Sequence, residues 1–150
     1  MQLARARPKV VLLMDSEGSF RRILARAALQ VGIEVIHATT GAGVLRMAIE
    51  KRPHLIVMEM SIPEMDGAQI LRHLKAIPQT TSIPVVIYSH RSDAVERSLV
   101  LRWGANDYLE TPFNLDTLVR CLEHQLFRTS ETTALADTPP SAPHAIRRKM

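Results

Sequence analysis

The chain has 150 residues, of which 46% are hydrophobic and 23% are charged, and it contains one cysteine. This length suits one domain with a sizeable core, and one cysteine excludes a framework of internal disulfides and fits a reducing compartment. No apolar run approaches the about 20 residues that span a bilayer. Asp15 and Glu17 interrupt the apolar run near the N-terminus, so we expect a cytoplasmic protein without a signal peptide.

The net charge of +4 comes from the two ends of the chain. Residues 1–9 hold three basic groups and no acid, and residues 128–150 hold four basic groups and two acids. Residues 10–127 therefore carry 12 basic and 13 acidic groups, a charge of −1. A solvated tail explains this distribution better than a nucleic-acid surface, and we expect neither nucleic acid nor a membrane as a partner.

Apolar runs and helical periodicity alternate five times along the chain. The strands are expected at residues 10–14, 33–38, 54–59, 83–88 and 107–110. Each is followed by a helix, and the expected caps are Ser16, Thr40, Asp66, Ser92 or Asp93, and Asn114. The first four helices are expected to stop at Gly32, Pro53, Pro78 and Gly104. In the fourth helix, Val95, Leu99 and Trp103 are the expected inward positions.

From Arg128 onward the sequence changes to Thr, Ser, Ala and Pro, which cannot bury enough apolar surface to fold. We therefore expect a flexible N-terminus at 1–8, one domain at 9–127 and a disordered basic tail at 128–150. Strands joined by helices run parallel with right-handed crossovers, and their helices cover both faces of the sheet. The predicted fold is an α/β, doubly wound, five-stranded parallel sheet.

In such a sheet the carboxyl ends of all strands lie at one edge. Four polar residues end or closely follow a strand, namely Asp15, Glu59, Ser89 and Thr111. Paired carboxylates suit a hard cation, and a cation brings phosphate to an acidic place. Any one of these residues alone is explained as a solvated strand end, but the four together favour a site.

From about Lys9 to Phe127 the chain resembles the receiver domain of bacterial response regulators. The resemblance is carried by 11–17 (VLLMDSE), 32–35 (GIEV), 53–59 (PHLIVME), 62–67 (IPEMDG), 83–86 (IPVV) and 104–113 (GANDYLETPF). It implies a flavodoxin-like sheet with the strand order 2-1-3-4-5. It also implies a phosphoryl-transfer site, in which an acidic pair binds Mg²⁺, an Asp accepts the phosphoryl group, and a Ser or Thr and a Lys bind it.

Carried onto this chain, the resemblance places Ser89 and Tyr108 at the phosphate-switch positions, and both residues fit. Three other positions depart from the pattern: the acidic pair is Asp15 and Ser16, the acceptor is Glu59, and the Lys position holds Thr111. Ser61 takes the place of a residue that lends its carbonyl to the metal, so Asp15, Glu59 and Ser61 form a weak or absent Mg²⁺ site. Pro112 is the candidate for a cis-proline, and His90 occupies a position that gates the pocket.

These departures remove a metal ligand and a positive charge, and Glu59 reaches farther than Asp by one methylene. Because phosphoryl transfer depends on positioning, we expect little or no phosphorylation. We expect no enzymatic activity and no required cofactor. The Glu59 carboxylate is expected to replace the phosphoryl oxygens, with Ser89 as a hydrogen-bond partner, and to hold a signalling state without a kinase. Residual phosphorylation and a merely decayed site are the alternatives.

In this family the output surface corresponds to Ser92–Phe127. Its expected partner is a histidine kinase or a downstream effector protein, and the chain is expected to be a monomer or weak homodimer. Because 128–150 is too short for a further domain, the chain resembles a stand-alone receiver. The competing functions are a working Mg²⁺-dependent phosphoacceptor and a nucleic-acid-associated protein that uses its basic ends.

Overall fold

The computed structural model describes residues 7–16, 18–62, 64–91 and 93–127. Within them, five strands alternate with five helices. The strands are β1 (Lys9–Met14), β2 (Ile33–Ala38), β3 (Leu55–Glu59), β4 (Val85–Ser89) and β5 (Asp107–Glu110). The helices are α1 (Ser19–Val31), α2 (Gly41–Lys51), α3 (Gly67–Ala76), α4 (Ala94–Arg102) and α5 (Leu115–Phe127). Apart from Arg7 and Pro8, the predicted end segments 1–8 and 128–150 lie outside the described residues.

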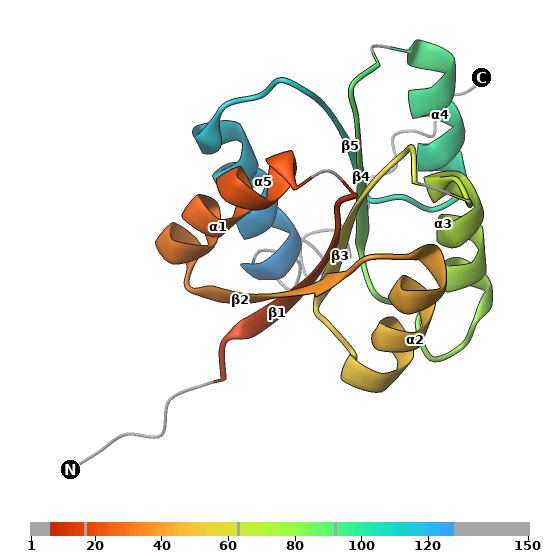
Figure 1. The fold of residues 1–150 in the computed structure, drawn as a ribbon, viewed down its shortest axis with the longest axis horizontal. Helices are drawn as coiled ribbons and strands as arrows, with labels where there is room; N and C mark the ends of the chain where they lie inside the picture. The colour runs from red at the N-terminus through yellow and green to blue at the C-terminus, as the bar shows by residue number, and fades with distance from the viewer. Residues whose placement is uncertain (1–6, 17, 63, 92, 128–150) are drawn as a thin grey trace, which may run out of the picture.

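The strands form one parallel sheet with the order β2-β1-β3-β4-β5. Helices α1 and α5 cover one face, while α2, α3 and α4 cover the other (Figure 1). The predicted fold class and strand order are therefore confirmed. No helix in the described part of the chain is long and apolar enough to cross a membrane.

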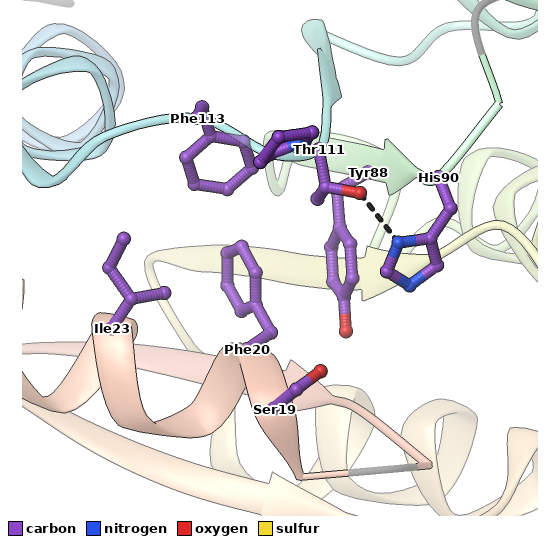
Figure 2. Close-up of a pocket in the computed structure, with 8 residues that line it drawn as sticks. Ser19, Phe20, Ile23, Tyr88, His90, Thr111 and Phe113 are labelled. Carbon is purple, nitrogen blue, oxygen red and sulfur yellow. Dashed lines mark hydrogen bonds between the residues drawn. The ribbon is translucent and has the colours of Figure 1, made fainter.

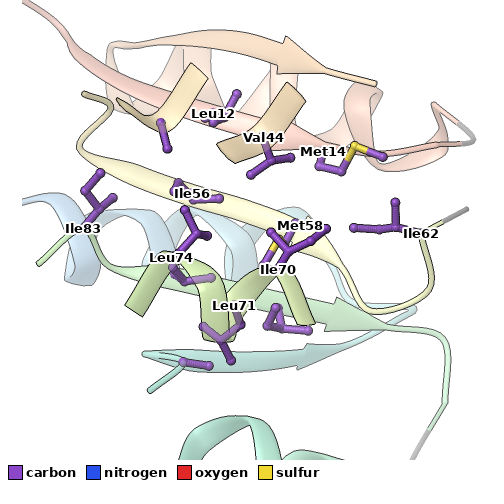
Figure 3. Packing of buried hydrophobic residues seen from close by; sticks show 14 of the residues in the cluster. Leu12, Met14, Val44, Ile56, Met58, Ile62, Ile70, Leu71, Leu74 and Ile83 are labelled. Carbon is purple, nitrogen blue, oxygen red and sulfur yellow. The ribbon is translucent and has the colours of Figure 1, made fainter. Parts of the chain in front are cut away.

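The central strands bury both of their faces, and alternate residues enter different cores. Leu12, Met14, Ile56 and Met58 pack with residues of α2 and α3 (Figure 3). The intervening residues Val11, Leu13, Leu55 and Val57 pack under α1 and α5. All five residues of β3 are buried, and the fifth is Glu59. A carboxylate thus lies at the end of a strand that is buried along its whole length.

Four of the predicted cap positions accept the expected hydrogen bonds. Thr40 Oγ1 accepts from Gly43 N at 2.9 Å, and Asp66 Oδ1 accepts from Gln69 N at 2.9 Å. Asp93 Oδ1 accepts from Val95 N at 3.0 Å, and Asn114 Oδ1 accepts from Thr117 N at 2.8 Å. These caps were predictable because they are local: each side chain bonds an amide only two or three residues ahead.

The predicted cap at Ser16 is wrong. Helix α1 begins at Ser19, after Gly18 in a left-handed conformation with φ of 84°. Asp15 reaches over this turn, and its Oδ2 accepts from Arg21 N at 2.9 Å. The Ser16 hydroxyl is not available for the helix because it donates to Glu59.

The predicted inward face of α4 is also wrong in part. Val95 is 68% exposed, whereas Val100, which was not predicted, is fully buried. Five residues along an α-helix correspond to a rotation of about 140° between them, so the two side chains cannot face the sheet together. Leu99 and Trp103 are half-buried, and the Arg72 guanidinium lies 5.0 Å from the centre of the Trp103 ring.

Candidate functional site

Four predicted site residues lie at the carboxyl edge of the sheet, as the parallel topology requires. Asp15 follows β1, Glu59 and Ser89 end β3 and β4, and Thr111 follows β5. Asp15, Glu59 and Ser89 are buried, with exposed fractions of 4%, 5% and 4%. Two carboxylates thus lie in an environment where each needs hydrogen-bond donors to remain charged at low cost.

The Glu59 carboxylate receives its donors from Ser16. Glu59 Oε1 accepts from the Ser16 backbone N at 2.5 Å and from the Ser16 hydroxyl at 2.6 Å. One residue therefore supplies two donors to one oxygen across 43 positions of sequence. The substitution of an acid by Ser at position 16 and the presence of Glu at 59 are complementary, because a hydroxyl donates to a carboxylate where a second carboxylate would repel it.

The expected hydrogen bond between Glu59 and Ser89 does not form in the described structure. Ser89 Oγ instead accepts from Arg91 N at 3.1 Å. Glu59 Oε1 accepts instead from the backbone amide and the hydroxyl of Ser16.

The ends of β4 and β5 are joined by Thr111. Its backbone N donates to Ser89 O at 2.8 Å, and its hydroxyl lies 3.3 Å from the same carbonyl oxygen. Thr111 Oγ1 also lies 2.6 Å from His90 Nδ1 (Figure 2). The predicted gate residue and the residue at the Lys position are therefore in direct contact. The peptide bond from Thr111 to Pro112 is cis.

Tyr108 is buried in β5, with 2% of its surface exposed. Its hydroxyl donates to Glu96 Oε2 at 2.8 Å. Burial raises the pKa of the Tyr108 phenol, a hydrogen bond with Ser89 acts in the opposite direction, and Glu96 raises the pKa further. The hydroxyl also lies 3.4 Å from Arg91 O, so this one side chain links the loop after β4 to the first turn of α4.

The residues present do not form a good magnesium site. In the described part of the chain, no group of three or more His, Cys, Asp and Glu side chains gathers to hold a metal. Glu59 Oε1 already accepts two hydrogen bonds and Asp15 Oδ2 accepts one, and the predicted ligand residue Ser61 is exposed. Mg²⁺ requires near-octahedral oxygen ligands, and these side chains do not supply them.

A small cavity of about 40 Å³ lies at this acidic end, and its lining includes Glu59, Ser61, Ser89 and His90. A second, larger recess of about 260 Å³ lies beside it on the α1 and α5 face. Its lining residues are Ser19, Phe20, Ile23, Tyr88, His90, Thr111, Pro112 and Phe113 (Figure 2).

The second recess was not predicted from the sequence. Three of the six aromatic side chains of the chain line it, namely Phe20, Tyr88 and Phe113. Their positions at 20, 88 and 113 gave one signal that could have been used. Tyr88 lies at the carboxyl end of a predicted strand, Phe113 follows the fifth strand, and Phe20 lies in the first turn of the helix after the first strand. The parallel topology brings these three places to one edge of the sheet.

Comparison with known proteins places this geometry in a family. The model of the response regulator receiver domain matches residues 11–123. The chain is 35% identical over 124 residues to the KDP operon transcriptional regulatory protein KdpE of Escherichia coli, covering 83% of this chain and 54% of that protein. It is 36% identical over 122 residues to the transcriptional regulatory protein PrrA of Mycobacterium tuberculosis, covering 81% and 52%. The chain thus spans about half the length of these curated relatives.

Solved structures agree with the fold. A putative response regulator from Chloroflexus aurantiacus superposes with a TM-score of 0.75 at 24% identity, covering 80% of this chain and 98% of that one. The chemotaxis response regulator CheY4 of Vibrio cholerae gives a TM-score of 0.73 at 24% identity, covering 80% and 100%. Together with the match of the family model over 11–123, these results show that the chain belongs to the response regulator receiver domain family of two-component signalling.

Proposed function

We propose that this receiver domain holds a signalling state without phosphorylation and passes it on by binding another protein. The observation that carries the proposal is the pair of hydrogen bonds from Ser16 to Glu59 Oε1, at 2.5 and 2.6 Å. They engage the carboxylate at the position where, by resemblance to the family, a phosphoryl group would be accepted.

Three features work against phosphoryl transfer at Glu59. Its Oε1 already accepts two hydrogen bonds, which lowers its availability as an attacking atom. The neutral hydroxyl of Thr111 stands at the Lys position and contacts His90 at 2.6 Å. The carboxylates present make a poor Mg²⁺ site. Phosphoryl transfer is catalysed by positioning of the reacting groups and by neutralisation of their charge. Each of the three features weakens one of these two contributions.

The fixed carboxylate can still set the state of the output surface. Ser89 Oγ accepts from Arg91 N at 3.1 Å, and the Tyr108 hydroxyl lies 3.4 Å from Arg91 O. The same Tyr108 hydroxyl donates to Glu96 Oε2 in α4 at 2.8 Å. An aromatic side chain at this place can be buried or turned out to solvent, and here it is buried. The proposal is that the Ser16–Glu59 pair helps to keep the edge of the sheet in the form that accommodates this buried Tyr108.

The proposed partner surface lies within residues 93–127, which form α4, β5 and α5. It exposes three large apolar side chains, Val95, Leu101 and Phe127, at 68%, 38% and 46%. Exposed apolar side chains on a rigid surface favour protein contacts. The relatives' names describe them as transcriptional regulators, so a protein of a transcriptional pathway is the proposed partner, with no catalytic turnover by this domain.

The proposal can be tested by following the backbone amide resonances of Ser89, Tyr108 and α4 by NMR. Acetyl phosphate with Mg²⁺ should leave these resonances unchanged in the native chain. Ser16→Ala should shift them without any phosphodonor, because it removes one of the two donors to Glu59. Ser82→Ala is the matched control, since Ser82 is exposed like Ser16 but precedes β4 at the opposite edge of the sheet. A saturable shift at Tyr108 on addition of acetyl phosphate and Mg²⁺ to the native chain would contradict the proposal and favour a residual phosphoacceptor.

A further inference from the structure

The recess beside the acidic site has an aromatic floor and open sides. Phe20 and Tyr88 are buried, with exposed fractions of 4% and 2%, while Ile23 and Phe113 are half-buried. The rings of Phe20 and Tyr88 stack with centroids 4.1 Å apart and an interplanar angle of 11°. Phe113 meets Phe20 edge-on, at 5.6 Å and 70°. The recess therefore presents aromatic walls in two orientations.

The polar groups of the recess lie at one end. Figure 2 shows Thr111 and His90 on one side and Ile23 on the other, with Ser19 at the start of α1. The volume of about 260 Å³ is close to the lower bound of ligand pockets, which are mostly apolar with a few convergent polar groups. This size suits a molecule of one or two rings and is small for a peptide segment.

The lining also restricts the charge of an occupant. None of the eight lining residues in the described part of the chain is Asp, Glu, Lys or Arg, so among them an ionised ligand would lose hydration without meeting an opposite charge. A neutral polar group can be accommodated. The ring nitrogen of His90 next to Thr111 is engaged at 2.6 Å, and the other, Nε2, is a donor or an acceptor according to the tautomer.

We propose that this recess is a binding site for a small, neutral, planar aromatic molecule. Its ring contacts Phe20, Ile23 and Phe113, and its polar group hydrogen-bonds at the His90 end. Aromatic pairs contribute beyond the area they bury when they are offset or edge-to-face, and both arrangements are available here. The site does not depend on the chemistry of Glu59. The ligand proposal therefore goes beyond the proposed function, and each of the two can be tested without the other.

A ligand bound in the recess would affect the contacts that lead to α4, which belongs to the proposed partner surface. His90 contacts Thr111, and Thr111 N donates to the carbonyl of Ser89 at 2.8 Å. Ser89 Oγ accepts from Arg91 N at 3.1 Å, and the Tyr108 hydroxyl lies 3.4 Å from Arg91 O. A ligand that hydrogen-bonds His90 is thus connected to the same residues that, in the proposed function, link the edge of the sheet to α4.

The test uses benzamide as a neutral probe and benzoate as its charged counterpart, with the full chain observed by NMR. Benzamide should shift the resonances of Phe20, His90 and Phe113 saturably, with a dissociation constant on the order of 1 mM for so small a molecule. Benzoate should bind at least about fivefold more weakly. His90→Ala should weaken benzamide binding about fivefold, the value of one hydrogen bond.

Ile23→Phe fills the recess and should abolish the shifts. Leu29→Phe is the matched control, because it adds the same ring to the same helix at a position that is 86% exposed, and it should bind benzamide like the native chain. Absence of a saturable shift in the native chain, or equal affinity in His90→Ala, would overturn the proposal even if Ile23→Phe fails to fold. Shifts of the same residues that depend only on protein concentration would assign the recess to a second copy of the chain and also overturn it.

Discussion

The polar side chains at the carboxyl edge of the sheet are hydrogen-bonded differently in its two halves. At β1 and β3, a buried carboxylate is satisfied by two short hydrogen bonds from Ser16. At β4 and β5, no buried carboxylate is involved in the contacts: Thr111 contacts His90, and the Ser89 hydroxyl accepts from Arg91 N. The first half is closed by charge-assisted bonds, while the second is held by weaker contacts beside an open recess of about 260 Å³. The difference suggests that the first half is fixed and the second can respond.

The largest expected coupling between two side chains tests the fixed half. A double-mutant cycle with Ser16→Ala and Glu59→Met, which keeps the side-chain size and removes the acceptor, should give a coupling free energy of about 1–2 kcal/mol. Denaturant unfolding of the four proteins measures it. A coupling close to zero would mean that the hydroxyl does not stabilise the carboxylate, and the two halves would then be alike.

A second effect concerns the buried switch residue. Tyr108→Phe removes the hydrogen bond to Glu96 from a side chain that is 2% exposed, and it should cost about 0.5–1.5 kcal/mol of unfolding free energy. The same unfolding measurement checks this value. No loss of stability would show that the contact between β5 and α4 is not maintained in solution.

The same residue predicts a pH dependence. Burial raises the pKa of the Tyr108 phenol, so its contribution to stability is complete below its ordinary pKa of about 10 and is lost as the pH rises through the folded-state value. The unfolding free energy of the native chain should therefore fall relative to that of Tyr108→Phe between about pH 9 and pH 11. A constant difference over this range would contradict the prediction.

The responsive half should show a smaller coupling. His90 is exposed and Thr111 is half-buried, so a cycle with His90→Ala and Thr111→Val should yield only about 0.5 kcal/mol. A coupling as large as that of the Ser16–Glu59 pair would remove the distinction between the two halves.

The smallest change in unfolding free energy is expected for an exposed position of α4, the helix next to the responsive half. Val95→Ser should change the unfolding free energy by less than about 0.5 kcal/mol, because Val95 is 68% exposed. Val100→Ala, at a fully buried position of the same helix, is the comparison and should cost about 1–3 kcal/mol. Equal costs would show that α4 packs through both positions.

The elements of the fold that local chemistry decides could be predicted from the sequence. The apolar runs gave five parallel strands, and the caps at Thr40, Asp66 and Asn114 followed from side chains that bond amides three residues ahead. Asp15, Glu59, Ser89 and Thr111 were also brought to one edge by topology alone. The phase of α4 was not predictable, because apolar residues occur around most of that helix and give it little amphipathic character.

The partners of the site residues depend on contacts between distant positions and were not predictable. Whether Glu59 bonds Ser16 or Ser89 depends on how the loops after β1 and β4 approach β3, and no periodicity reports that. Likewise, the aromatic recess joins positions 20, 88 and 113, which are far apart in sequence. Its existence follows from side-chain packing and not from a motif.

The central claim is that Glu59 is an engaged carboxylate and not a phosphoacceptor. Intact-mass analysis after incubation with acetyl phosphate and Mg²⁺ tests it most directly, on the native chain, on Glu59→Asp, and on the triple variant Ser16→Asp, Glu59→Asp, Thr111→Lys. The account predicts one added phosphoryl group on the triple variant and none on the native chain or on Glu59→Asp. A phosphoryl group on Glu59 of the native chain would contradict it.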